Sequence, residues 1–330
     1  MKHLNIDLIN IVLIALSLTI ALIFPFELFL YSYAILGPLH YITELNWLKG
    51  KNYFVNIRKS WMIPFLMAAI AVSIYPVVLH LWPNPSTSLK FYLNQLADGS
   101  NFLMIAVFFF SIALVSLKNQ KQLLAFGASL AIAILIYIIL PTSFIYLAVF
   151  LPTLLHVYVF TALFILYGAR KSISLLGLIT FFIMIIVPFI IYILPDKLFL
   201  NAPSETTLST YLNSNMMTVN AFLAQLINGL ESGDFYATSI SGLKIQTFIG
   251  FAYTYHYLNW FSKTSIIGWY KELSPKKIMA IGLFWFAAIA IYFYDFQTGF
   301  IVLFLLSFIH VVLEFPLNAV TIKALLTFKK

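Results

Sequence analysis

Most of this chain consists of apolar stretches that are each long enough to cross a lipid bilayer. A transmembrane helix needs about 20 mainly apolar residues, because the hydrocarbon core of a bilayer is roughly 30 Å thick. Soluble domains carry about 25% charged residues, whereas 9% of this chain is charged and 62% is hydrophobic. We therefore predict an all-α, polytopic transmembrane helix bundle that forms a single domain over residues 1–330.

Prolines and short polar segments divide the apolar stretches into about ten predicted helices. Pro25, Pro141 and Pro195 mark helix ends, because proline disrupts the helix that precedes it. At Pro25 a single kinked helix remains the alternative. No A-x-A-like cleavage site follows the first stretch, so we interpret it as a retained helix. The predicted spans are 8–24, 26–48, 61–82, 101–117, 122–140, 143–168, 173–194, 238–262, 278–295 and 299–322.

The basic residues gather in alternate connections, and this pattern predicts the orientation. With ten spans, most of the 19 Lys and Arg lie at the two termini or in the segments 49–60, 118–121, 169–172 and 263–277. Cytoplasmic loops are enriched in basic residues, so we expect both termini to be cytoplasmic. The net charge of +8 then reflects these loops and not a nucleic-acid partner. We expect a multi-pass protein of the cell (inner or plasma) membrane, whose oligomeric state the sequence does not indicate.

The segment 195–237 is the longest one predicted outside the spans, on the extracytoplasmic side. Its first part is polar, and residues 219–230 are moderately apolar. The apolar part fits an interfacial helix, or equally a solvated loop with a short helix.

Four of the six histidines fall within predicted spans, one on each of four helices: His40, His156, His256 and His310. Each precedes the basic end of its helix by 7 to 14 residues, or about 10–21 Å at 1.5 Å per residue. Because the four helices are predicted to run in the same direction, the imidazoles can occupy one layer of the membrane. Ionisable groups at such depth are functional by default, so we predict a shared metal ion; scattered hydrogen bonds between helices are the alternative.

A glutamate follows two of these histidines by four residues: Glu44 after His40, and Glu314 after His310. Residues four apart share a helix face. A carboxylate so placed can accept the second ring N–H of a ligand histidine and orient the ring. We predict this orienting role for both glutamates, with direct metal ligation as the alternative.

Prolines lie close to the same histidines, at Pro38, Pro152 and Pro316. Proline frees backbone carbonyls and bends helices, which opens space for a substrate or only kinks the helix. Polar and aromatic residues near His156 and His256 are candidates for a substrate pocket: Tyr158, Tyr255, Asn259 and Trp260.

The chain has no cysteine, which excludes thiolate metal sites and cysteine catalysis. An all-imidazole ligand set suits iron, zinc or copper. A site surrounded by hydrocarbon favours a lipophilic substrate that enters from the bilayer, and O2 also partitions into lipid. These considerations favour Fe(II) as the cofactor and an O2-dependent membrane oxygenase as the function, with zinc or copper still open.

Four segments, in order, resemble motifs of the Brp/Blh family of membrane-bound β-carotene 15,15′-dioxygenases. They are Gly37-Pro-Leu-His40-Tyr-Ile-Thr-Glu44, Leu155-His156-Val-Tyr158, Tyr255-His256-Tyr-Leu-Asn259-Trp260 and Ile309-His310-Val-Val-Leu-Glu314. The chain departs from the family pattern at Trp260, where the family has a second histidine, and at Phe160 or Thr161, where it has an acid. The resemblance implies an iron-dependent dioxygenase of carotenoids, which in its most specific form cleaves β-carotene to retinal.

Three other functions remain open at this point. Haem could use two or four of the histidines, and a proton-coupled transporter could use the intramembrane His and Glu as a relay. A structural partner of another membrane protein would tolerate the loss of all four histidines.

Overall fold

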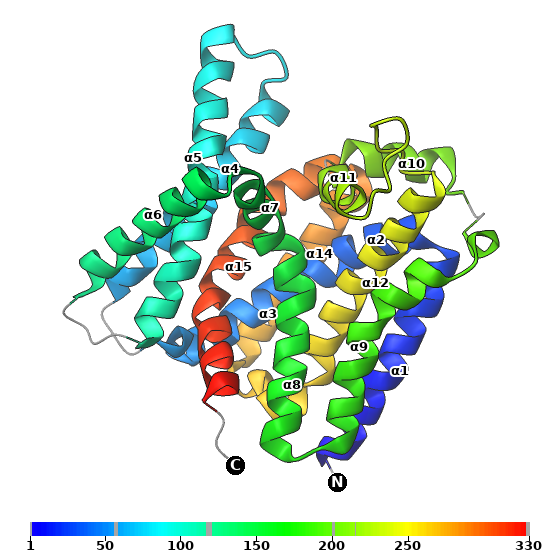
Figure 1. Cartoon of the computed structure of the whole chain (residues 1–330). Coiled ribbons are helices and arrows are strands. Elements are labelled where there is room, and N and C mark those ends of the chain that lie inside the picture. The colour runs from blue at the N-terminus through cyan, green and yellow to red at the C-terminus, as the bar shows by residue number, and fades with distance from the viewer. Residues whose placement is uncertain (1, 56–58, 117–120, 200–201, 215, 328–330) are drawn as a thin grey trace. The chain divides into compact units, whose positions relative to one another are not determined.

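The computed structural model describes residues 2–55, 59–116, 121–199, 202–214 and 216–327, and over these residues the named elements are all helices (Figure 1). The prediction of an all-α, polytopic membrane protein is confirmed: eight helices in the described part of the chain are long and apolar enough to cross a membrane. Parts of three basic segments used for the orientation, residues 56–58, 117–120 and 328–330, lie outside the described residues.

Every predicted span corresponds to helical structure. Eight spans are α1 (Lys2–Ile23), α4 (Met62–Leu81), α5 (Thr87–Ser116), α6 (Gln122–Ile139), the continuous stretch α7 (Pro141–Phe150), η5 (Leu151–Phe160) and α8 (Thr161–Ser172), α9 (Leu175–Ile193), α14 (Pro275–Tyr294) and α15 (Phe296–Leu326). The span predicted at 26–48 is divided into α2 (Pro25–Tyr31), the π-helix η1 (Ser32–Leu36) and α3 (Gly37–Gly50). The span predicted at 238–262 is α12 (Ile240–Ser262). Its many polar residues keep it out of the eight helices that are apolar enough to cross a membrane.

Local sequence signals explain several helix starts. Pro25, Pro141 and Pro275 begin α2, α7 and α14, because proline at the first helical position loses no hydrogen bond. Phe24 is not helical (φ −133°, ψ 63°), so the break at Pro25 is real and the alternative of one kinked helix is wrong. The Ser174, Ser204, Ser239 and Ser274 side chains accept backbone N–H groups at the starts of α9, α10 (Glu205–Asn213), α12 and α14.

The chain forms two compact units, of which the first comprises residues 1–40 and 157–297. Its central helix is α12, which contacts α1, α2, η1, α9 and α11 (Met217–Leu226) and is visible beside α1 and α9 in Figure 1. The polar side chains of α12 are buried and find partners there: Gln246 donates to the Pro25 carbonyl at 3.2 Å, and Thr254 bonds to Ser32 at 2.7 Å. These contacts explain why a helix of such mixed composition lies inside the unit.

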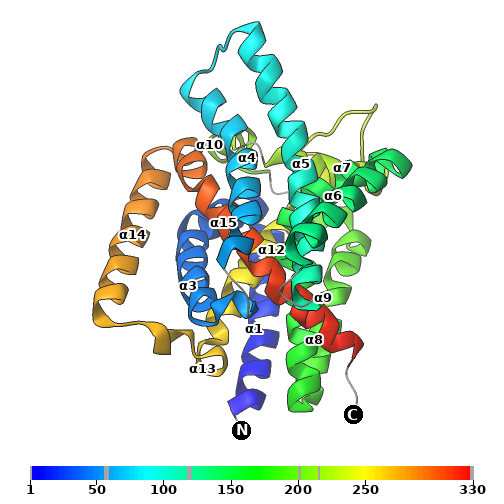
Figure 2. The same ribbon diagram turned by 90° about the vertical axis from the view of Figure 1, so that its left-hand side faces the viewer.

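The second unit comprises residues 41–156 and 298–330. Its helix α5 packs against α4, α6 and α7, and α4 and α5 form a long antiparallel hairpin (Figure 2). A core of Ile105, Ala106, Ala133, Phe144 and Ala148 joins α5, α6 and α7. Ring contact between Phe108 and Phe315 connects α5 to α15.

The segment 195–237 contains two short helices, α10 and α11, together with the 3-10 turn Asp196–Leu198. Helix α11 covers most of the apolar part and packs against α12. Asn220 of α11 donates to the Gln246 side chain at 2.8 Å. The segment therefore contains a short helix, as both interpretations of the sequence expected.

Candidate metal centre

Two of the four histidines lie in or beside π-helical segments. The π-helix η1 ends directly before Gly37-Pro38-Leu39-His40, and η5 contains both Pro152 and His156. Proline has no N–H to donate, and π-helical turns are rare and frequent at functional sites. The Trp285 indole donates to the Ile35 carbonyl of η1 at 2.7 Å, so a carbonyl near this irregular turn has a partner on α14.

In the first unit, His40 of α3 and His256 of α12 form a close pair. Their Nε2 atoms are 3.1 Å apart, and the rings meet nearly edge to face at 78°. The rings of Tyr257 and Trp260 pack against His40, with centroids 5.2 and 5.7 Å away. All of these side chains are buried.

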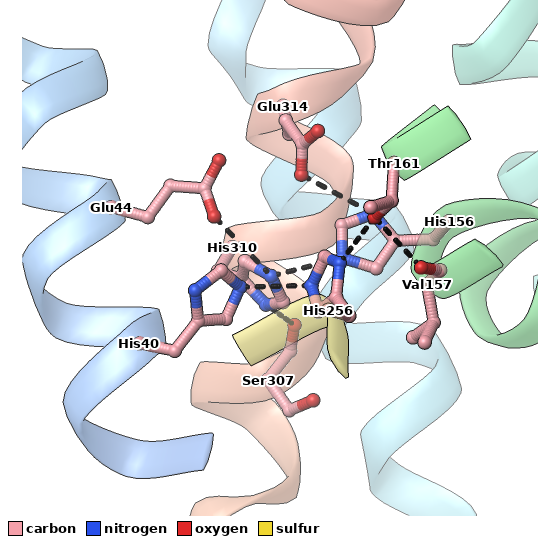
Figure 3. A network of polar contacts seen from close by, with 9 residues as sticks. All are labelled: His40, Glu44, His156, Val157, Thr161, His256, Ser307, His310 and Glu314. Carbon is pink, nitrogen blue, oxygen red and sulfur yellow. Dashed lines mark hydrogen bonds and ion pairs between the residues drawn. The ribbon is translucent and has the colours of Figure 1, made fainter. Parts of the chain in front are cut away.

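Thr161 determines which nitrogen of His256 carries the proton. Its hydroxyl lies 2.8 Å from the Val157 carbonyl and 2.7 Å from His256 Nδ1. A hydroxyl has one proton, and the carbonyl can only accept it. His256 Nδ1–H therefore donates to the Thr161 oxygen, and a neutral His256 presents an unprotonated Nε2 to His40 (Figure 3).

In the second unit, His156 of η5 and His310 of α15 form a matching pair. Their Nε2 atoms are also 3.1 Å apart, with the rings at 78°. His310 Nδ1 donates to the Ser307 carbonyl at 2.7 Å, so its Nε2 is unprotonated when the ring is neutral. Tyr41 stacks on the His310 ring at a centroid distance of 4.6 Å.

The two glutamates lie on different sides of this second pair. Glu314 Oε2 is 3.3 Å from His156 Nδ1, on the outer nitrogen of the ring. Glu44 Oε2 is 3.9 Å from His310 Nε2, the nitrogen that faces His156. The position of Glu314 fits the orienting role, whereas Glu44 lies on the side where a metal would lie.

The structure thus contains a buried group of His and Glu side chains that could hold a metal ion. One ring nitrogen from each of His40, His156, His256 and His310 lies within 4.8 Å of the other three. Glu44, His310 and Glu314 form a second set by the same measure. The six side chains are between 1% and 7% exposed.

Of the four residues expected to line a pocket, Trp260 alone has a described contact with one of these histidines. The Tyr158 hydroxyl donates to the Met184 carbonyl, and its ring packs on Phe248. Tyr255 and Asn259 both donate to Asn10 Oδ1 of α1, at 3.2 and 2.7 Å. Their polar groups therefore join α12 to α1.

Three residues that contact the histidines were not among the sequence candidates: Tyr41, Thr161 and Tyr257. Tyr41 and Tyr257 each follow a predicted ligand by one residue, but a neighbour in sequence points away from the same helix face, so spacing gave no signal. Thr161 was noted in the sequence only as a departure from a Brp/Blh motif, which has an acid there, and this gave no indication of its contact with His256.

The fold and the site together define a polytopic helical membrane protein with a buried His and Glu group suited to metal binding. Comparisons of the chain with protein-family models, with curated proteins and with solved structures gave no match.

Proposed function

We propose that the chain is a membrane-embedded non-haem iron oxygenase that acts on a lipophilic substrate. The observation that carries the proposal is the 3.1 Å approach of ring nitrogens in both histidine pairs. In the pair His156–His310, the Ser307 carbonyl holds the proton of His310 on Nδ1, and Glu314 favours the proton of His156 on Nδ1. Two lone pairs then face each other, and a cation between them removes their repulsion.

The nitrogen separation also fits a metal. Metal–imidazole bonds of about 2.1 Å place adjacent ligands roughly 3.0 Å apart at 90° and roughly 3.4 Å apart at a tetrahedral angle. The observed 3.1 Å lies in this range. Two buried carboxylates, Glu44 and Glu314, would neutralise a divalent ion held by neutral imidazoles, which a low-dielectric site requires.

Each residue near the histidines has a role in this proposal. His40, His156, His256 and His310 hold the metal, while Thr161, the Ser307 carbonyl and Glu314 orient the rings. The rings of Tyr41, Tyr257 and Trp260 pack on the ligands and exclude water. Bound Fe(II) with open coordination positions would supply the activation of O2.

The substrate class is proposed from the burial of the site and from the family resemblance. His156 lies on the stretch Pro141–Ser172, and His310 and Glu314 lie on α15. Both stretches are apolar enough to cross a membrane, which favours a substrate dissolved in the bilayer. The four motifs that resemble the Brp/Blh family point to a carotenoid, with β-carotene cleavage to retinal as the most specific version.

A proton relay is the second candidate function, because Glu314, His156 and His310 form a continuous chain of polar contacts. In that function His156 Nε2–H donates to His310 and no metal is needed. A bis-histidine haem fits less well: trans ligands at about 2 Å from iron are about 4 Å apart, and both pairs are closer than that.

The proposal is tested by supplying iron-loaded protein in lipid nanodiscs with β-carotene and ¹⁸O2. We expect iron-dependent cleavage and ¹⁸O in the aldehyde product, measured by mass spectrometry with trapping of the aldehyde before it exchanges with water. His310→Ala should abolish product formation. His80→Ala is the matched control. His80 lies at the end of α4, contacts Thr298 and belongs to neither histidine pair. Iron-loaded protein that converts neither β-carotene nor extracted membrane lipids would contradict the proposal.

A further inference from the structure

Three buried, oxygen-bearing side chains of the second unit lie outside the set of four imidazoles proposed to hold the metal. Glu44 is 3% exposed, Glu314 is 1% exposed and Asn318 is fully buried. On α15, Asn318 follows Glu314 by four residues, and Glu314 follows His310 by four. Residues at this spacing share one helix face, so Asn318 continues the face that carries the ligand and the carboxylate.

Asn318 lacks the partners that a buried amide requires. Neither its Nδ2 nor its Oδ1 has a hydrogen-bond partner among the described residues, and Glu314 Oε2 has only the ion-pair contact with His156. A buried polar group without a partner is destabilising, and native proteins satisfy such groups with water or an ion. The amide of Asn318, on the face of α15 beyond Glu314, therefore needs water or an ion as its partner.

The position of Glu44 also favours a bound ion. Glu44 lies 3.9 Å from His310 Nε2, so it does not accept the outer N–H of that ring, which the Ser307 carbonyl already takes. One carboxylate oxygen of Glu44 lies within 4.8 Å of one of Glu314. Two carboxylates at this separation can bind the same cation.

We propose that Glu44, Glu314 and Asn318 bind a second divalent cation through oxygen ligands, next to the metal held by the histidines. An imidazole nitrogen binds one metal ion at a time, so the second ion depends on carboxylate and amide oxygens. Such ligands suit Mg²⁺, Mn²⁺ or Fe(II). This inference rests on the proposed function in one respect only, the first metal ion held by the four histidines.

The test is the number of metal ions per chain, measured by anaerobic titration of the purified full chain with Fe(II) and, separately, with Mn²⁺. We expect two ions in the wild type. Asn318→Leu and the double variant Glu44→Gln/Glu314→Gln should bind one ion, and His256→Ala should keep only the oxygen-bound ion. Thr321→Val is the matched control, because Thr321 is buried on the same helix, and it should bind two ions.

Asn318→Asp separates metal binding from a packing role. A third carboxylate should tighten Mn²⁺ binding at the oxygen-ligand site by about tenfold. If residue 318 only packs, the added charge should leave Mn²⁺ affinity unchanged.

The outcomes distinguish this inference from the proposed function. A wild type without metal would overturn both. One ion per chain that is lost in His256→Ala and kept in Asn318→Leu would overturn the second site alone and leave water as the partner of Asn318. Two ions that persist in Asn318→Leu and in the double glutamine variant would also overturn it.

Discussion

At the residue scale, the chemistry of the site depends on the groups that bind Nδ1 of His156, His256 and His310. The sequence predicted the four histidines and the two glutamates, because spacing and depth along apolar helices are local properties. It could not predict that Thr161 accepts from His256, since the two residues are 95 positions apart and meet only in the folded chain. The Ser307 carbonyl is a backbone group that no sequence motif marks.

We expect Thr161→Val to weaken metal binding by about 10- to 100-fold, the usual effect of removing an outer partner of a ligand histidine. Valine keeps the shape of threonine but leaves His256 Nδ1–H without an acceptor. The measurement is a competition titration with a metal chelator. Thr247→Val is the control, because Thr247 makes the same bond to its own helix, at Leu243, without touching a histidine. Equal affinities in the two variants would argue against an orienting role for Thr161.

At the scale of elements, α12 shows what a sequence pattern leaves undetermined. Its length and position were predicted, but its central place in the first unit was not, because the buried partners of Gln246 and Thr254 lie on α2, η1 and α11. Prolines near His40 and His156 predicted irregular helices. The π-helical form of η1 and η5 depends on the tertiary setting and appeared only in the structure.

Helix α12 passes close to α2 at Gly250. A Cβ at this position would lie 2.8 Å from the Pro25 carbonyl oxygen, so Gly250→Ala should destabilise the protein by about 1–3 kcal/mol through overpacking. Gly127 is the matched control on α6: nothing lies within 4 Å of its added Cβ. Unfolding midpoints in mixed micelles would compare the variants. A Gly250→Ala midpoint equal to that of Gly127→Ala would contradict this packing.

At the scale of the whole molecule, the fold class was the most predictable property, because a chain with 9% charged residues has few alternatives to the bilayer. Ten predicted spans recur as helical structure, eight of them apolar enough to be recognised as membrane spans. The cytoplasmic position of both termini stays a prediction, since it rests on charge distribution and not on helix packing. The division into two compact units had no sequence signal, because its boundaries fall inside helices, directly after His40 and His156.

The central claim is that histidines from four helices hold one metal ion, and metal content tests it most directly. Detergent-purified wild-type protein should carry tightly bound metal, and His310→Ala should lose the ion held by the histidines while still inserting into the membrane. His80→Ala should match the wild type. Full metal content in His310→Ala, or none in the wild type after anaerobic loading with Fe(II), would contradict the claim.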